Sequence, residues 1–228
     1  MTAQALWAER RLGYRFRSDE LLELALTHRS ASARNNERLE FLGDAILGAI
    51  MADALFRRRP NEGEGMLSRI RSRLVRGETL AEIAREIELG PLILLGAGER
   101  RTGGGQRSST LSNALEALLG AVYLDGGMDA AERVVLGLFA ARLEHLPAAH
   151  DLIDPKTRLQ EWLQARGQPP PAYRVNDVAG QAHAQTFEVL CTIEGSGLAV
   201  AGHGASRRLA EQDAAARAFE RLTVPDGG

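Results

Sequence analysis

The sequence contains almost no cysteine and no continuous apolar run long enough to cross a membrane. Cys191 is the only cysteine among 228 residues, which excludes an intrachain disulfide and predicts a reducing compartment. No stretch of about 18 uninterrupted apolar residues occurs, and no charged-then-apolar leader begins the chain. We therefore expect a cytoplasmic protein that does not associate with membranes.

The chain also lacks an excess of positive charge. Its formal net charge is −2, its pI is about 6.2, and Lys156 is its only lysine. This balance does not by itself indicate a nucleic-acid-binding protein. Any contact with nucleic acid must therefore come from arginines that are grouped on one part of the surface, not from an overall excess of them. A hydrophobic content of 44% and a charged content of 25% are ordinary for a globular protein. Its length allows one large domain or two small ones.

Acidic residues are concentrated in one short stretch, residues 36–44, which precedes an apolar run over 45–51. In a helix, at about 100° per residue, Glu37, Glu40 and Asp44 lie within about 60° of one another. Carboxylates this close raise one another's pKa, and a hard divalent cation such as Mg²⁺ is the usual compensation. A solvated acidic face is the alternative interpretation.

Two further features favour the metal site. Gly43 stands inside the predicted helix, where it costs about 0.5–1 kcal/mol relative to alanine, and this indicates that another backbone approaches closely. Downstream, Asn113 and Glu116 are three residues apart in an apolar helical stretch and thus about 60° apart around its axis. Two buried helices that each offer oxygen ligands could form one metal site between them.

Apolar periodicity predicts two regions of different secondary structure. Residues up to about 146 are expected to be helical, whereas Pro147 to Pro155 marks a boundary. Beyond it we expect a helix over 156–164, an extended run from 173, strands over 186–193 and 198–200, and a helix over 206–222. The predicted fold is an all-α domain over 1–147, a linker over 148–154 and a small α+β domain of order α-β-β-β-α over 155–224.

Four blocks of sequence, taken in order, resemble one known family. They are residues 25–30, 36–44, 64–68 and 111–125, and the predicted α-β-β-β-α region follows them. The chain resembles bacterial ribonuclease III over nearly its whole length. This resemblance implies an all-helical endonuclease domain, a double-stranded-RNA-binding domain, and a homodimer, for which the apolar face around Phe41, Leu42 and Gly43 is the expected symmetric contact.

The resemblance implies a role for each acidic residue. Glu40, Asp44 and Glu116 would form the Mg²⁺-binding core, and the loss of Asp44 or Glu116 would be the most harmful. Glu37 and Glu64 match further acidic positions of the family's catalytic centre and would have supporting roles. Mg²⁺ held by carboxylates can activate water, neutralise phosphoryl oxygens and stabilise the leaving alkoxide. We therefore expect no small-molecule cofactor.

The chain departs from the family at Asn113, where an aspartate is usual. An amide oxygen can still bind Mg²⁺ or its waters, so Asn113 is retained as a predicted metal ligand, but one negative charge is missing. His28 lies beside a threonine and an arginine and is interpreted as a structural hydrogen-bonding residue rather than a catalyst.

The resemblance also implies how the second domain recognises RNA by shape. Gln160 and Glu161, on its first helix, would contact one minor groove, and His183, in the loop over 180–185, would contact the next. The last helix would bind phosphates across the intervening major groove through its first residues, which are Ser206, Arg207 and Arg208.

Two functions remain open at this point. The first is Mg²⁺-dependent cleavage of double-stranded RNA to 5′-phosphate and 3′-hydroxyl ends, with short 3′ overhangs, in the processing of ribosomal-RNA precursors and structured messenger RNAs. The second is a catalytically weak protein that binds double-stranded RNA and regulates without cutting it.

Overall fold

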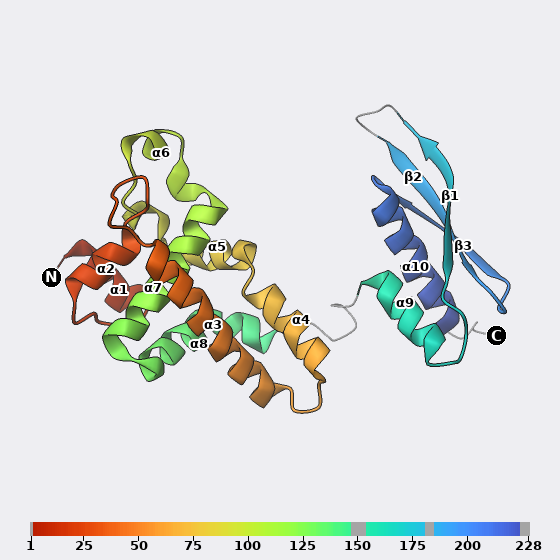
Figure 1. Cartoon of the computed structure of the whole chain (residues 1–228), viewed down its shortest axis with the longest axis horizontal. Helices are drawn as coiled ribbons and strands as arrows, with labels where there is room; N and C mark the ends of the chain where they lie inside the picture. Colours follow the sequence, from red (N-terminus) through yellow and green to blue (C-terminus); the bar gives the residue numbers. More distant parts are fainter. Residues whose placement is uncertain (1, 147–153, 181–184, 224–228) are drawn as a thin grey trace. The chain divides into compact units, whose positions relative to one another are not determined.

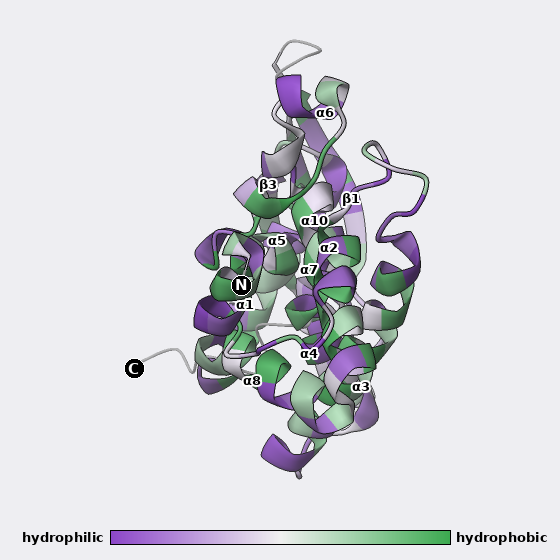
Figure 2. Ribbon diagram, turned by 90° about the vertical axis from the view of Figure 1, so that its left-hand side faces the viewer, coloured by the Kyte–Doolittle hydropathy of each residue, from purple (hydrophilic) through white to green (hydrophobic). Residues whose placement is uncertain are grey.

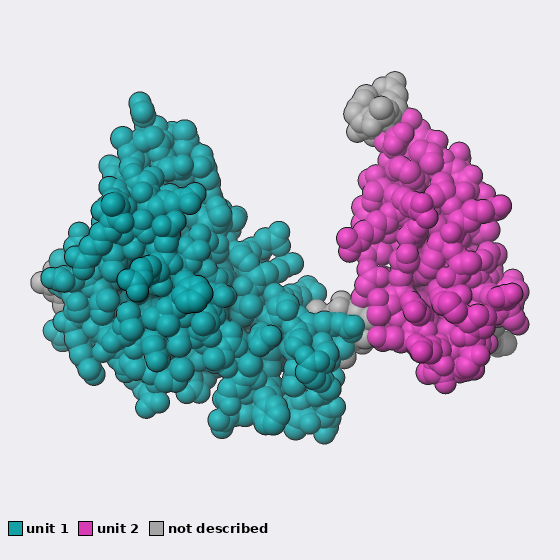
Figure 3. Space-filling view, in the orientation of Figure 1, with its two compact units in different colours: residues 1–147 teal, residues 148–228 magenta. Residues whose placement is uncertain are grey.

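The computed structural model describes residues 2–146, 154–180 and 185–223 (Figure 1). The chain divides into two compact units, residues 1–147 (unit 1) and 148–228 (unit 2), which are distinguished by colour in Figure 3. Asp154 forms the N-cap of the first helix of unit 2. The other residues of the predicted linker, 148–153, lie outside the described residues, and so does His183.

Unit 1 is helical, as predicted. Two short 3₁₀ turns, Gly90–Leu92 and Gly104–Gln106, connect longer elements. Among the described residues, no helix has the length and apolar composition needed to cross a membrane. The α-helices are α1 Ala3–Arg11, α2 Asp19–Leu26, α3 Glu37–Arg58, α4 Glu64–Leu74, α5 Gly77–Glu86, α6 Ala97–Arg101, α7 Ser108–Gly126 and α8 Met128–Glu144.

Helix α7 forms the centre of the unit 1 core. Side chains all around it, including Leu111, Leu115 and Leu118, are fully buried, and a helix that is apolar on every side must be enclosed by other elements. Helices α2, α3, α5 and α8 pack against it. The α3 ribbon alternates hydrophilic and hydrophobic segments in Figure 2, as expected for a helix with one buried face.

Helices α3 and α7 approach each other closely through two glycines. A Cβ atom at Gly43 would overlap the carbonyl oxygen of Glu116, and one at Gly120 would overlap that of Leu39. The close backbone approach predicted from Gly43 is therefore present. Gly43 faces α7 and is buried, whereas Leu42 is half-buried. The prediction that Gly43 belongs to the dimer contact face is therefore wrong.

Unit 2 consists of a three-stranded antiparallel sheet with two helices. Helix α10 (Arg207–Thr223) packs against β2, β3 and α9 (Pro155–Gln164). Cys191, whose pKa is raised by burial, lies with Leu159 and Val200 in the core between helices and sheet. The strands, in sheet order, are β1 Ala172–Ala179, β2 Thr186–Ile193 and β3 Leu198–Gly204.

Candidate active site

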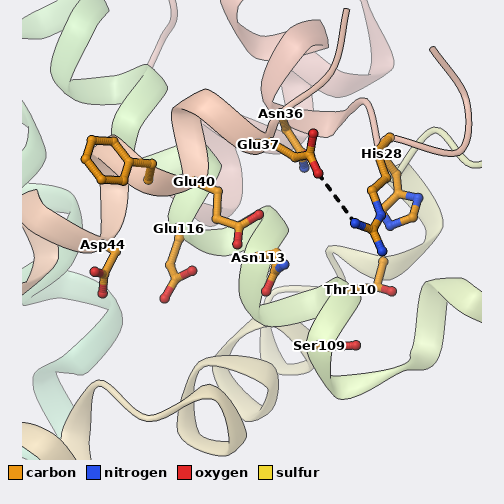
Figure 4. Close-up of a pocket in the computed structure, with 11 residues that line it drawn as sticks. His28, Asn36, Glu37, Glu40, Asp44, Ser109, Thr110, Asn113 and Glu116 are labelled. Carbon is orange, nitrogen blue, oxygen red and sulfur yellow. Dashed lines mark ion pairs between the residues drawn. The ribbon is translucent and has the colours of Figure 1, made fainter. Parts of the chain in front are cut away.

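A pocket of about 540 Å³ lies where α3 passes the first half of α7 (Figure 4). Glu40, Asp44 and Glu116 lie at one end, the acidic end, and His28, Ser109 and Thr110 lie at the other. Glu37 reaches toward this second end, where it forms an ion pair with Arg29. The residues that line the pocket are His28, Arg29, Asn36, Glu37, Glu40, Phe41, Asp44, Ser109, Thr110, Asn113 and Glu116.

The structure places Glu40, Asp44 and Glu116, carboxylates from two helices, in the lining of this one pocket. Glu40 and Asp44 lie one turn apart on α3, and Glu116 comes from α7 at the glycine crossing. Burial, followed by the charges of Asp44 and Glu40, raises the pKa of Glu116 to about 7. Burial also raises the pKa of Glu40. The pocket therefore concentrates negative charge.

These oxygen donors suit a hard divalent cation. In the described part of the chain, however, no three carboxylate, imidazole or thiolate groups are close enough to share one ion as they stand. Metal binding would therefore require these carboxylates to rotate toward one another.

Asn113 links the two helices in a way that the sequence did not predict. Its side-chain oxygen accepts a hydrogen bond from Ser112 Oγ at 3.3 Å. Its amide also lies near enough to Glu40 to lower the pKa of that carboxyl, against the larger effect of burial. Because a carboxylate only accepts, the amide nitrogen faces Glu40. For Asn113 to bind a metal ion through its oxygen, the amide would have to turn over.

The opposite end of the pocket contains residues that sequence reasoning missed. Arg29 forms an ion pair with Glu37 at 3.5 Å, and Ser109 and Thr110 line the wall. These two residues precede Asn113 by four and three positions, and this helical spacing was the signal that could have identified them. His28 has a structural bond, since its Nδ1 lies 2.8 Å from Ser30 Oγ, but it also lines the pocket.

Glu64 is not brought to this pocket within one chain. It begins α4, accepts a hydrogen bond from Ser68 Oγ at 2.9 Å, and lines a separate pocket of about 590 Å³ beside Phe56. The predicted supporting role of Glu64 therefore requires a second copy of the chain.

The predicted RNA-binding residues of unit 2 that the structure describes are exposed. Gln160 and Glu161 lie on α9, and Ser206 Oγ accepts a hydrogen bond from the backbone of Leu209 at the start of α10. Arg207 Nε donates to Glu211 at 2.9 Å. Glu211 also accepts from Lys156 Nζ at 2.6 Å, and these bonds to Lys156 and Arg207 lower its pKa.

Comparison with known proteins gives two domain assignments. The Ribonuclease-III-like family matches residues 18–143, and the Double-stranded RNA binding motif matches residues 155–222. Ribonuclease 3 of Nitrosococcus oceani is 55% identical, and the match covers 93% of this chain and 92% of that protein. Ribonuclease 3 of Hahella chejuensis is 53% identical over 98% of this chain and 99% of its own length.

Solved structures agree with these relatives. The nuclease domain of ribonuclease III from Campylobacter jejuni is 38% identical in one crystal structure, with a TM-score of 0.61, covering 64% of this chain and all of that chain. A second structure of the same nuclease domain, described for structural flexibility in the region involved in dimer formation, is 40% identical with a TM-score of 0.59. The match covers 61% of this chain and 98% of that chain. The chain therefore belongs to the ribonuclease III family, whose members are endoribonucleases that cleave double-stranded RNA.

Proposed function

We propose that Glu40, Asp44 and Glu116 bind Mg²⁺ and that the pocket hydrolyses phosphodiester bonds of double-stranded RNA to 5′-phosphate and 3′-hydroxyl ends. Nucleases of this family generally need a divalent metal ion. The main support is the raised pKa of Glu116, because burial beside two further carboxylates makes the pocket favourable for a cation. When bound, Mg²⁺ would supply an activated water and neutralise phosphoryl oxygens.

The protein's own residues would hold and orient these groups. The glycine crossing keeps Glu116 opposite Glu40 and Asp44, so the donors are held by packed helices rather than by loops. Glu37, paired with Arg29, would support the site from its edge. On unit 2, Gln160, Glu161 and His183 would contact minor grooves, whereas Ser206, Arg207 and Arg208 would bind phosphates. We expect the enzyme to process ribosomal-RNA precursors and structured messenger RNAs in the cytoplasm.

Incubation of labelled duplex RNA with the full-length protein, in Mg²⁺ or in EDTA, tests this function against the binding-only alternative. Cuts that require Mg²⁺ and leave 5′-phosphate ends would support hydrolysis. Binding without cuts in every metal condition would instead identify a regulator, for which the loss of one charge at Asn113 would be the structural cause.

The exposed face of α3 supports a homodimer. Phe41 is 80% exposed and Phe56 71% exposed, and Ala45 and Ala49 leave a shallow surface between them. Two copies of α3 paired antiparallel about a twofold axis would bring Phe41 of each copy to the pocket beside Phe56 of the other. Because Phe41 also lines the acidic pocket and Glu64 lines the pocket at Phe56, this pairing would bring Glu64 toward the other copy's active site.

Truncation of Phe41 to alanine is expected to weaken the dimer by about 30-fold or more, because loss of a central aromatic contact costs about 2 kcal/mol or more. Sedimentation velocity over a concentration series would measure the change. Leu124, which is 53% exposed on α7, offers a control, and Leu124→Ala should leave the dissociation constant unchanged. Equal effects of the two variants would exclude this face as the contact.

The Asn113→Asp variant is expected to lower the Mg²⁺ concentration for half-maximal cleavage by about tenfold, because it adds a charged oxygen ligand. In EDTA at pH 8 the same variant should have a lower melting temperature, since a carboxylate would replace the amide donor beside Glu40. Metal titrations and thermal melts would measure both effects. Asn61→Asp, in an exposed turn, is the control, and an unchanged Mg²⁺ requirement would mean that residue 113 does not bind the metal.

A further inference from the structure

We propose that the first turn of α7, with Ser109, Thr110 and Arg29, forms a second phosphate subsite, which binds a phosphate next to the cleaved one on the same RNA strand. The inference rests on the proposed function, because it assumes that the acidic end of the pocket contains the bond to be cut. It adds a binding role at the opposite end, where no residue was assigned one.

The Thr110 hydroxyl is the first observation. Thr110 is only 7% exposed, it lines the pocket, and its hydroxyl has no hydrogen-bond partner among the described residues. The hydroxyl is not one of the fully enclosed polar atoms that lack a partner, so it faces the open pocket. A ligand oxygen in the pocket would find a hydrogen-bond donor there. Another buried threonine of unit 1, Thr79, donates instead to the carbonyl oxygen of Arg73 at 3.0 Å.

The backbone at the same place also favours an anion. Arg107, at the N-cap of α7, provides no side-chain cap, so the N–H groups of the first turn, over 108–110, have no side-chain acceptor. Helix α7 is 19 residues long, and the partial positive charge at the start of such a helix attracts phosphate. Thr110 and the N–H groups thus point to the same kind of ligand.

Arg29 supplies the charge. Its side chain is 71% exposed and pairs with Glu37, which is 55% exposed, at 3.5 Å. An ion pair this exposed contributes little energy, so Arg29 can turn to a phosphate at small cost. The pocket thus has one end with Glu40, Asp44 and Glu116, which repels a bare phosphate (Figure 4). The other end, the donor end, contains hydroxyl donors and Arg29, whose charge there is balanced by Glu37 until a phosphate takes its place.

The spacing along α7 sets where the RNA strand runs. Thr110 precedes Glu116 by six residues, which is roughly 9 Å along the helix axis. Ser109, Asn113 and Glu116 follow one another on the same face of the helix. A strand that lies along this face would meet the donor end first and the carboxylates next, so the donor end would position the neighbouring phosphate and thereby align the bond to be cut.

A chemical substitution in the RNA tests the subsite directly. A series of duplexes would each carry one uncharged methylphosphonate close to the cleaved bond, and binding to full-length protein would be measured in EDTA, together with single-turnover cleavage in Mg²⁺. For the wild type, a methylphosphonate at one position besides the cleaved bond should weaken binding by about tenfold. Thr110→Val should weaken binding of unmodified RNA by a similar factor and show no further loss at that position.

Matched variants make the outcome decisive. Thr192→Val, on the exposed side of β2, should behave like the wild type with every duplex, and Thr110→Ser should recover the sensitivity to the modified position because it keeps the hydroxyl. Melting temperatures would show that each variant is folded. A full additional loss for Thr110→Val at the sensitive position, or no loss on unmodified RNA, would overturn the subsite. Failure of the wild type to cut unmodified RNA would instead overturn the proposed function.

Discussion

Replacing Glu116 by glutamine is expected to reduce Mg²⁺-dependent cleavage of duplex RNA by about a thousandfold or more. Glu116 is the half-buried carboxylate on α7 whose pKa is raised by burial and by the charges of Asp44 and Glu40. Its loss would remove several kcal/mol of metal-mediated transition-state stabilisation, at about 1.4 kcal/mol per tenfold. Duplex binding in EDTA should change by less than about twofold, because unit 2 matches the double-stranded RNA binding motif and we expect it to make most of the phosphate contacts. Single-turnover cleavage and filter binding would measure the two quantities.

The same variant has an opposite effect on the stability of the metal-free protein. The pKa of Glu116 is raised to about 7 in the folded chain, from 4.5. The protonated Glu116 side chain fits the folded state, so its contribution to the stability of the wild type is fully present below pH 4.5. That stability is lost as the pH rises through about 7 and the folded protein must accept a charged Glu116. After allowance for solvent screening, the cost at pH 8 is about 1–2 kcal/mol. Glu116→Gln should therefore raise Tm in EDTA by about 2–6 °C at pH 8 and leave it nearly unchanged near pH 4.5.

Glu9→Gln is the matched control for both measurements, since Glu9 is exposed on α1 and remote from the pocket in sequence. It should alter neither cleavage nor the pH dependence of Tm. If Glu116→Gln lowered Tm at pH 8 in EDTA, Glu116 would be stabilised by a partner rather than strained by its neighbours. Retained cleavage in Glu116→Gln would remove this residue from the proposed metal site.

Replacing Gly43 by alanine is expected to destabilise unit 1 by about 3 kcal/mol or more. The added methyl would overlap the carbonyl oxygen of Glu116, and a clash with backbone costs more than the usual 1–3 kcal/mol for an overfilled core. The two helices would have to move apart, which separates Glu116 from Glu40 and Asp44. We expect a Tm lower by about 6–12 °C, together with a lower affinity for Mg²⁺ at temperatures where the variant is folded.

Gly137, inside α8, provides the control for this change. A Cβ atom there would meet nothing within 4 Å, so Gly137→Ala should stabilise the protein by about 0.5–1 kcal/mol through helix propensity alone. Differential scanning calorimetry of both variants, with and without Mg²⁺, would measure the effects. Equal Tm values for the two variants would mean that the α3–α7 crossing tolerates a wider spacing than the structure has.

The sequence alone determined the order of elements and most of the acidic site. Strong apolar periodicity and punctuation by proline and glycine specify where helices and strands begin, because these signals act over a few residues. The acids on α3 share a face for the same local reason, and Gly43 inside a helix was enough to predict a close neighbour. The departure at Asn113 was also visible without coordinates.

Tertiary structure decided what these residues touch. The direction of the Asn113 amide depends on Ser112 and Glu40 together, and the high pKa of Glu116 depends on burial by helices distant in sequence. Glu64, which the family resemblance predicted to support the active site, lines a different pocket. Thr110 lines the acidic pocket through its place on α7. Helical periodicity specifies one face of one helix, whereas side-chain contacts and desolvation arise only when two helices pack. Here Gly43 and Gly120 set the distance between α3 and α7.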